Sequence, residues 1–253
     1  MPGPGTDVLI RGAGPVGCTL ALALLGSHLK VAILGRAESR AALRPLALSH
    51  ASRLILERLD VWRSLEVTPI LRVHVSQQEA FGRTVMDAAD AGVPALGYVT
   101  EYSALLSVLH SRCRELLVQE EMQARCVVHA EGSLPQAREK RYAQDALVAL
   151  VRTEPVSEGT AFERFTPEGP LALLPLAGRY ALIWSCRPER AAELAQCSEE
   201  LFLNRLGLAA GRRPGMIEMV LAQAKGNQTL AAQMLGINRN TLRTKMQQLR
   251  IKG

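Results

Sequence analysis

Residues 7–35 decide the fold of the N-terminal part, and they read DVLIRGAGPVGCTLALALLGSHLKVAILG. The run DVLIR has the length of a buried strand, GAGPVG is a glycine turn, and the Ala/Leu-rich stretch after Pro15 suits a helix packed on a sheet. KVAIL is a second apolar run of strand length. The segment therefore predicts two parallel strands joined by a helix, the unit from which Rossmann-like α/β domains are built.

Gly12, Gly14 and Gly17 give the turn the spacing GxGxxG. The first glycine permits the tight turn, the second lets a pyrophosphate approach the backbone, and the third lets helix and strand pack closely. The helix N-terminus then faces the phosphate. A glycine turn without a ligand is the alternative, but the position between a strand and a helix favours dinucleotide binding. A side chain at Gly14 is expected to crowd the turn.

The rest of residues 1–210 alternates between the two kinds of apolar pattern. Helical spacing recurs in 49–65, 102–119 and 188–207, and in the first of these Leu54, Ile55, Leu59 and Trp62 form the expected apolar face. Apolar runs bounded by Gly and Pro predict strands within 126–132, 145–155, 159–176 and 179–189. We expect an α/β fold with an added β-rich portion.

Composition limits the classes of protein. The chain has 253 residues, 48% of them hydrophobic, and no uninterrupted apolar stretch approaches the roughly 20 residues of a membrane span. The first residues lack the pattern of a secretion signal, so a cytoplasmic location is expected. Five widely spaced cysteines without a CxxC pair argue against a disulfide framework and a zinc site, and no metal is expected.

Positive charge is concentrated at the C-terminus. Residues 215–253 hold six basic residues against Glu218 alone, a net charge of +5, whereas the whole chain carries +6. Such an asymmetry predicts a basic appendage for a polyanion. The small, basic stretch GLAAGRRPG at 207–215 marks the boundary. We therefore expect a domain over 1–210, a junction over 211–215 and a small helical domain over 216–253.

The last 28 residues, GNQTLAAQMLGINRNTLRTKMQQLRIKG, have the pattern of a helix-turn-helix. Asn227 and Asn238 are suited to cap two successive helices, and Gly236 ends the first of them. In the second helix Leu242, Met246 and Leu249 form the buried stripe. A short helix, a glycine turn and a basic second helix match the geometry that places a recognition helix in the major groove.

This tail resembles the Fis family of bacterial nucleoid and regulatory proteins. The resemblance implies contacts to double-stranded DNA, with phosphate bound by Asn227 and Thr229. In and before the recognition helix it implies contacts by Asn238, Arg239, Thr241, Arg243 and Lys245. Members of that family are dimers, so a homodimer and association with the nucleoid are also implied.

Residues 7–206 resemble the flavin-dependent aromatic hydroxylases of ubiquinone biosynthesis. Beyond the glycine turn, the resemblance includes RPLALSHASRLILERLDVW from Arg44, HVSQQEAFGRTVMDAADAGVPALGYVTEYSALL from His74, and GTAFERFTPEGPLALLPL from Gly159. The last stretch would line the substrate pocket over the flavin. The resemblance implies that FAD contacts Gly12, Gly14, Gly17, Arg44, Glu131 and Gly132.

Departures from that pattern favour an incomplete hydroxylase domain. The second strand ends Ile33-Leu34-Gly35, where an acidic residue would hold the adenosine ribose, and Glu38 is a poor substitute. Nothing after Gly207 resembles the remaining flavin-binding motifs of the family, and the stretch between Tyr102 and Glu131 is short. Arg11 would be costly to bury without a partner.

Two functions therefore remain open. The first is a Fis-type DNA-binding protein whose hydroxylase-like domain is inactive and does not retain stoichiometric FAD. The second is an FAD- and NAD(P)H-dependent aromatic hydroxylase acting on a ubiquinone precursor. The sequence assigns no catalytic residue.

Overall fold

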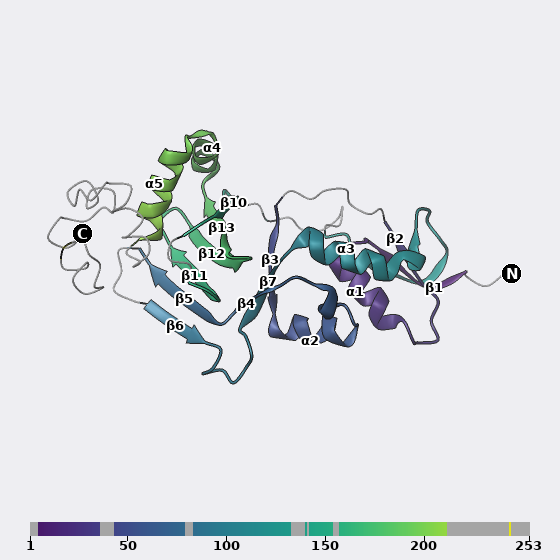
Figure 1. The fold of residues 1–253 in the computed structure, drawn as a ribbon. Coiled ribbons are helices and arrows are strands. Elements are labelled where there is room, and N and C mark those ends of the chain that lie inside the picture. Colours follow the sequence, from purple (N-terminus) through teal and green to yellow (C-terminus); the bar gives the residue numbers. More distant parts are fainter. Residues whose placement is uncertain are drawn as a thin grey trace. The chain divides into compact units, whose positions relative to one another are not determined.

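The computed structural model describes residues 5–35, 43–78, 83–132, 140, 142–153, 157–211 and 243. These residues divide into two compact units (Figure 1). The first takes its described residues from 5–67 and 97–140, and the second from 68–96 and 142–211. Each unit has its own hydrophobic core.

The first unit contains the predicted strand, helix and strand. Its strands are β1 (Thr6–Arg11), β2 (Val31–Leu34), β3 (Pro45–Ser49), β7 (Gly97–Glu101), β8 (Leu117–Val118) and β9 (Ala124–His129). Its helices are α1 (Pro15–Leu24), α2 (His50–Arg58) and α3 (Tyr102–Cys113), with short 3-10 turns at Trp62–Ser64 and Arg114–Leu116.

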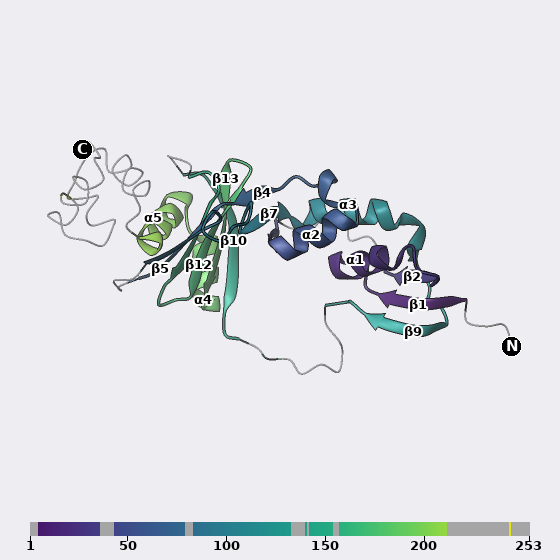
Figure 2. The same cartoon turned by 90° about the horizontal axis from the view of Figure 1, so that it is seen from below.

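A parallel sheet in the order β8-β2-β1-β9 organises this unit, and Figure 2 shows its strands β9, β1 and β2 side by side. β3 and β7 pair antiparallel. The Rossmann-like α/β architecture predicted from residues 7–35 is thereby confirmed.

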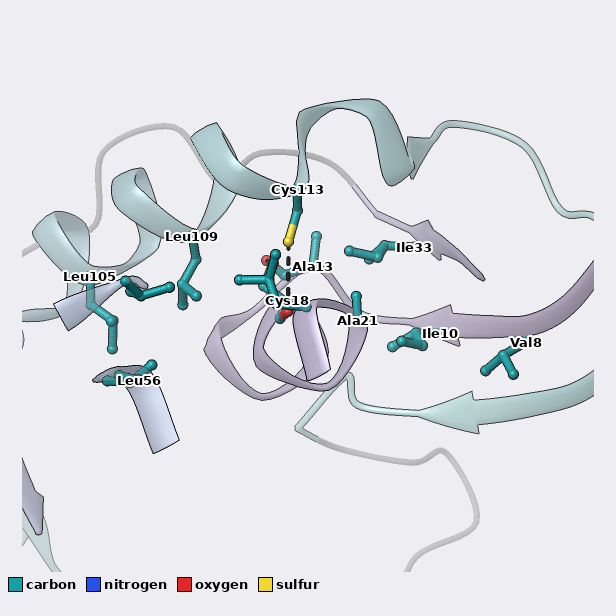
Figure 3. Close-up of a cluster of buried hydrophobic side chains, with 12 residues drawn as sticks. Val8, Ile10, Ala13, Cys18, Ala21, Ile33, Leu56, Leu105, Leu109 and Cys113 are labelled. Carbon is teal, nitrogen blue, oxygen red and sulfur yellow. Dashed lines mark hydrogen bonds between the residues drawn. The ribbon is translucent and has the colours of Figure 1, made fainter. Parts of the chain in front are cut away.

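The core of the first unit lies between the sheet and the helices α1 and α3. Ile10 and Ile33 from the sheet, Cys18 from α1, and Leu109 and Cys113 from α3 are fully buried in it (Figure 3). The thiol of Cys113 donates to the carbonyl oxygen of Cys18 at 3.6 Å. The hydrogen bond with Cys113, together with burial, raises the pKa of the Cys18 thiol. Cys18 therefore behaves as a small apolar core residue at neutral pH.

Helix α2 is shorter than the pattern in 49–65 predicts, and it buries a different face. Ser49 caps it by accepting a hydrogen bond of 3.0 Å from the amide of Ser52. Leu54 and Ile55 are 42% and 49% exposed, whereas Leu56 is buried. The predicted apolar face was therefore wrong at Leu54 and Ile55, whereas Leu59 and Trp62, which follow the end of the helix at Arg58, pack against the core as expected.

The second unit is built on a six-stranded sheet in the order β10-β13-β12-β11-β5-β6. The strands of this sheet are β5 (Arg72–Gln77), β6 (Arg83–Asp87), β10 (Asp145–Val151), β11 (Thr160–Phe165), β12 (Pro170–Leu176) and β13 (Arg179–Cys186). The unit also contains the short strand β4 (Thr68–Ile70). Helices α4 (Pro188–Gln196) and α5 (Glu199–Ala210) follow. Leu194, Leu206 and Ala209 of these helices pack on Leu182 and Trp184 of the sheet.

Helix α5 has clear start and stop signals. Ser198 caps it by accepting a hydrogen bond of 3.3 Å from the amide of Leu201, and Glu199 and Glu200 lie in its first turn. Gly211 ends the helix with a φ of +71°, a conformation that glycine adopts without strain. No helix in the part of the chain that the structure describes is long and apolar enough to cross a membrane.

Candidate dinucleotide site

The glycine turn between β1 and α1 requires glycine at its first and third positions. Gly12 has a φ of +111°, and a Cβ there would lie 2.5 Å from the carbonyl oxygen of Ala130. A Cβ at Gly17 would overlap the carbonyl oxygen of Gly12. The turn is therefore pressed against the end of β9 on one side and folded under α1 on the other. This tight packing is what the GxGxxG spacing predicts.

Gly14 differs from its two neighbours because space lies beside it. It is the residue before the first turn of α1, with a φ of −74°, and a Cβ there would meet only the hydroxyl of Tyr102, at 3.8 Å. The expectation that a side chain at Gly14 would crowd the turn is wrong, because no atom of the described residues other than the Tyr102 hydroxyl comes within 4 Å of that Cβ position. The open side of Gly14 and the uncapped N-terminus of α1 fit the close approach of a phosphate.

Arg44 contacts Tyr102, the residue whose hydroxyl borders this open space. The guanidinium of Arg44 lies 4.6 Å from the centroid of the Tyr102 ring, and the amide of Tyr102 donates to the carbonyl oxygen of Arg44 at 2.9 Å. The hydroxyl of the same tyrosine is the group nearest to Gly14. Tyr102 thus contacts Arg44 through its ring and borders the space at Gly14 with its hydroxyl, although Arg44 and Gly14 are 30 positions apart in the sequence.

Glu131 and Gly132 lie at the carboxyl end of β9, next to Gly12. The amide of Ala130 donates to the carbonyl oxygen of Arg11 at 2.7 Å, and so the β9 end is bonded to the start of the glycine turn. The carboxylate of Glu131 accepts a hydrogen bond of 3.1 Å from Nδ1 of His129. Gly132 turns the chain with a φ of +82°. The structure therefore gathers Gly12, Gly14, Gly17, Arg44, Glu131 and Gly132 at one end of the parallel sheet.

Two side chains next to the glycine turn were not predicted from the sequence. Tyr102 is one, and His110 is the other: its Nε2 donates to the carbonyl oxygen of Ala13 at 2.7 Å. A carbonyl oxygen only accepts, so Nε2 carries the proton. The thiol of Cys18 donates to the same oxygen at 3.3 Å. Both missed residues belong to α3, and only their contact with a turn 90 residues away reveals their role.

Arg11 is not an unpaired buried charge. Its side chain is 34% exposed and forms an ion pair with Glu121, with Nε donating to the carboxylate at 3.2 Å. The hydrogen bond with Glu121 raises the pKa of Arg11 above its ordinary value. The expectation that Arg11 would weigh against a stable domain is therefore wrong, because the sequence gives no sign that Glu121 reaches it.

Gly35 occupies the strand end where a ribose-binding carboxylate was expected. A Cβ at Gly35 would lie 2.9 Å from both the Cβ and the amide nitrogen of Ala13. A side chain at position 35 would therefore require the glycine turn to shift. Glu38 and Arg36 lie outside the described residues.

In the second unit, the stretch from Gly159 forms strands β11 and β12 with a tight turn between them. The backbones of Thr166 and Gly169 bond to each other at 3.1 Å in both directions. Glu163 lies on β11 opposite Ala172 and Val75, two apolar neighbours. Burial among them raises the pKa of the Glu163 carboxyl.

Of the seven predicted DNA contacts, six lie outside the described residues: Asn227, Thr229, Asn238, Arg239, Thr241 and Lys245. Arg243 is described, and it is helical and exposed. In the described part of the chain, no group of three or more His, Cys, Asp or Glu side chains could hold a metal ion.

Comparison with known proteins assigns the two ends of the chain to different families. The family model "Bacterial regulatory protein, Fis family", a helix-turn-helix, matches residues 215–249. The 3-demethoxyubiquinol 3-hydroxylase of Escherichia coli is 30% identical over 270 residues, covering 85% of this chain and 69% of the relative. The ubiquinone hydroxylase UbiL of Rhodospirillum rubrum is 30% identical over 255 residues, covering 85% of this chain and 59% of the relative.

Solved structures show the same fold. Pseudomonas aeruginosa PqsL in complex with 2-aminobenzoylacetate aligns with a TM-score of 0.63 and 19% identity, over 79% of this chain and 66% of that protein. The match to the E. coli enzyme spans 270 positions, more than the 253 residues of the whole chain, so the relative carries residues within the matched region that this chain lacks. The chain spans between 59% and 69% of the length of the two hydroxylases.

Proposed function

Given that the chain belongs to the family of the 3-demethoxyubiquinol 3-hydroxylase, we propose that its hydroxylase-family part serves as the scaffold of a Fis-type DNA-binding protein and does not turn over as an enzyme. Double-stranded DNA is its partner, and its place of action is the nucleoid in the cytoplasm. Residues 215–253 are the element that binds the DNA.

The match of residues 215–249 to the Fis-family helix-turn-helix carries the proposal. Charge supports it, because residues 215–253 carry a net charge of +5, whereas the whole chain carries +6. Neutralising phosphates releases counterions, so nonspecific affinity follows local positive charge. Arg239 and Arg243 stand at the start of the expected recognition helix, the part that reaches base edges in helix-turn-helix proteins.

Single substitutions in the intact chain test the proposal. If Arg243 reads a guanine, Arg243→Ala costs about 1–3 kcal/mol on the preferred duplex. Lys245→Ala serves as the matched control, since it weakens all duplexes alike and lowers the salt slope by about one. Equal affinities of both variants and the wild type for every duplex would contradict the proposal.

A second candidate function, FAD-dependent hydroxylation of an aromatic ubiquinone precursor, is favoured by the open space at Gly14. Gly12, Gly14 and Gly17 with the N-terminus of α1 would hold a diphosphate, and Arg44 would add a positive charge beside it. Bound FAD would supply the redox chemistry of hydroxylation, with NAD(P)H and oxygen as co-substrates. The residues of this chain would bind and orient it.

Two observations make us prefer the first function. The ribose carboxylate is missing from the end of β2, where Ala13 leaves no room for a side chain. The chain also spans at most 69% of the length of the two hydroxylases. We therefore expect FAD to bind weakly and to be lost on gel filtration. A flavin absorbance corresponding to nearly one FAD per purified chain would instead favour the hydroxylase.

A further inference from the structure

Strand β6 ends the six-stranded sheet of the second unit, and its outer edge pairs with no other strand of the described residues. Four of its five side chains are exposed. Val85 and Met86 are 47% and 46% exposed, unusual values for apolar residues in the middle of a strand. An exposed edge with apolar side chains is a ready template for pairing with another strand.

The hydrogen bonds that β6 makes to β5 fix which of its backbone groups point outward. The amide of Ala88 donates to the carbonyl oxygen of Leu71 at 2.8 Å, so this amide points toward β5, while the amide of Leu71 donates to Gly159 at 2.7 Å. Hydrogen-bonded pairs alternate in an antiparallel ladder, so the backbones of Met86 and Thr84 also point toward β5. The backbones of Arg83, Val85 and Asp87 therefore point away from the sheet.

The charges on this edge are complementary to a second copy of the same edge. Arg83 and Asp87 stand at the two ends of β6 and on the same face as Val85, because they are two residues away from it. A twofold axis through Val85 places Arg83 of one copy opposite Asp87 of the other. The arrangement is isologous, so each contact occurs twice.

We propose that two copies of this chain associate through antiparallel pairing of their β6 strands, with Val85 on the twofold axis and Arg83 facing the carboxylate of Asp87 across the interface. The sheets of the two copies become continuous. The outward amide and carbonyl of Val85 bond to their symmetry equivalents, and the amide of Asp87 bonds to the carbonyl of the opposite Arg83.

Asp87 has room for a second cation. Its carboxylate already accepts from Nε and Nη2 of Arg72, at 2.9 and 2.7 Å, through one oxygen. Among the described residues, the other oxygen accepts from the amide of Ala89 alone, at 3.2 Å. A carboxylate offers about four acceptor positions. The backbone carbonyl oxygen of Asp87 accepts a hydrogen bond from the amide of Ala91 at 3.3 Å. The backbone pairing between the two copies therefore uses the amide of Asp87 and not its carbonyl oxygen.

The dimer would serve DNA binding, because helix-turn-helix proteins read paired half-sites as twofold dimers. This role of the dimer rests on the proposed function. A five-residue strand pair is small beside a standard interface. We therefore expect a weak dimer in free solution that is strengthened when both tails bind one duplex.

Cysteine cross-linking tests the axis of the interface. In a hydrogen-bonded antiparallel pair the two Cα atoms are about 5.5 Å apart, within reach of a disulfide. Val85→Cys should therefore cross-link under a mild oxidant such as diamide. Thr84→Cys is the matched control, because the axis separates its two copies by more than about 7 Å, beyond disulfide reach. Both variants are made in a Cys126→Ser background, since Cys126 is exposed.

Sedimentation equilibrium of the full chain supplies a second, independent measurement. Arg83→Glu places like charges across the axis and should raise the dimer dissociation constant roughly tenfold. Arg83 forms no ion pair with another described residue, and Asp87 pairs with Arg72, so the substitution should leave folding unchanged. A monomer at all concentrations, or equal cross-linking of both cysteine variants, would overturn the proposal. Dimers that bind no DNA would refute the proposed function instead.

Discussion

Nε2 of His110 donates a hydrogen bond of 2.7 Å to the carbonyl oxygen of Ala13, in the middle of the glycine turn. Tyr102, at the start of the same helix α3, lies beside Gly14 and under Arg44. The His110 bond therefore ties α3 to the turn, and Tyr102 borders the open space beside it. The shape of the turn depends on α3 as well as on its glycines.

His110→Ala should lower the free energy of unfolding by about 1 kcal/mol, because the Ala13 carbonyl loses its shorter hydrogen bond in a part-buried position. His28→Ala is the control, since His28 is exposed. Urea denaturation followed by circular dichroism measures both. Equal stabilities of the two variants would show that the His110 bond contributes nothing.

Gly14→Ala should leave stability unchanged within about 0.5 kcal/mol but weaken the binding of FAD or ADP, because only a ligand would occupy the space at this residue. Gly12→Ala gives the contrast: its positive φ and the overlap with Ala130 should cost about 2 kcal/mol or more. Denaturation and equilibrium dialysis separate the two effects. A Gly14→Ala variant that binds as well as the wild type would exclude a phosphate at this position.

Glu163→Gln should stabilise the protein at pH 7 and have no effect near pH 4. Burial raises the folded-state pKa of Glu163 above its ordinary value of 4.5. The unfolded state therefore releases this proton more readily, and the carboxyl lowers stability as pH rises from about the unfolded value through the folded pKa. Thermal melts of both proteins at several pH values test this. A pH-independent difference would show that ionisation of Glu163 is not involved.

Gly211→Ala should destabilise the second unit by roughly 1 kcal/mol more than Gly178→Ala. Both glycines have φ near +70°, but open space surrounds Gly178, whereas a Cβ at Gly211 would lie 2.5 Å from the guanidinium carbon of Arg164. Arg164 would have to move and lose its 3.2 Å hydrogen bond to Ser76.

A double-mutant cycle provides the check for Gly211. In an Arg164→Ala background, the cost of Gly211→Ala should fall to that of Gly178→Ala, because the strained φ alone remains. An unchanged difference between the two glycines would mean that Arg164 does not set the cost.

Local patterns predicted many elements of this fold, because each depends on residues near one another in the chain, but they did not indicate the strands β3, β5, β6 and β7. The strands from Val31 and Arg179 and the helix from Tyr102 fall within the predicted ranges, and the strand from Ala124 begins two residues before its predicted range. The parallel sheet follows from the strand-helix-strand unit. Local patterns failed at Leu54 and Ile55, since the face that α2 buries is chosen by its neighbours.

The candidate site was predictable only in part, because several of its contacts join residues that are far apart in the sequence. The glycine turn and Arg44 were found from motif and resemblance. The partners of Ala13 and Arg11, namely His110 and Glu121, lie about 100 positions away, and no local pattern points to them. The space beside Gly14 likewise depends on where α3 places Tyr102, which the sequence around the turn does not specify.

The most direct test of the account is a fluorescence-anisotropy titration of duplex DNA with three proteins at two salt concentrations. They are the intact chain, the chain truncated after Ala210, and the Arg239→Ala/Arg243→Ala variant. Because residues 215–253 carry a net charge of +5, we expect the truncated chain to lose essentially all affinity. The double variant should lose most of its affinity with a smaller salt slope. If the truncated chain binds duplex as tightly as the intact one, residues 215–253 are not the DNA-binding element, and the account is wrong.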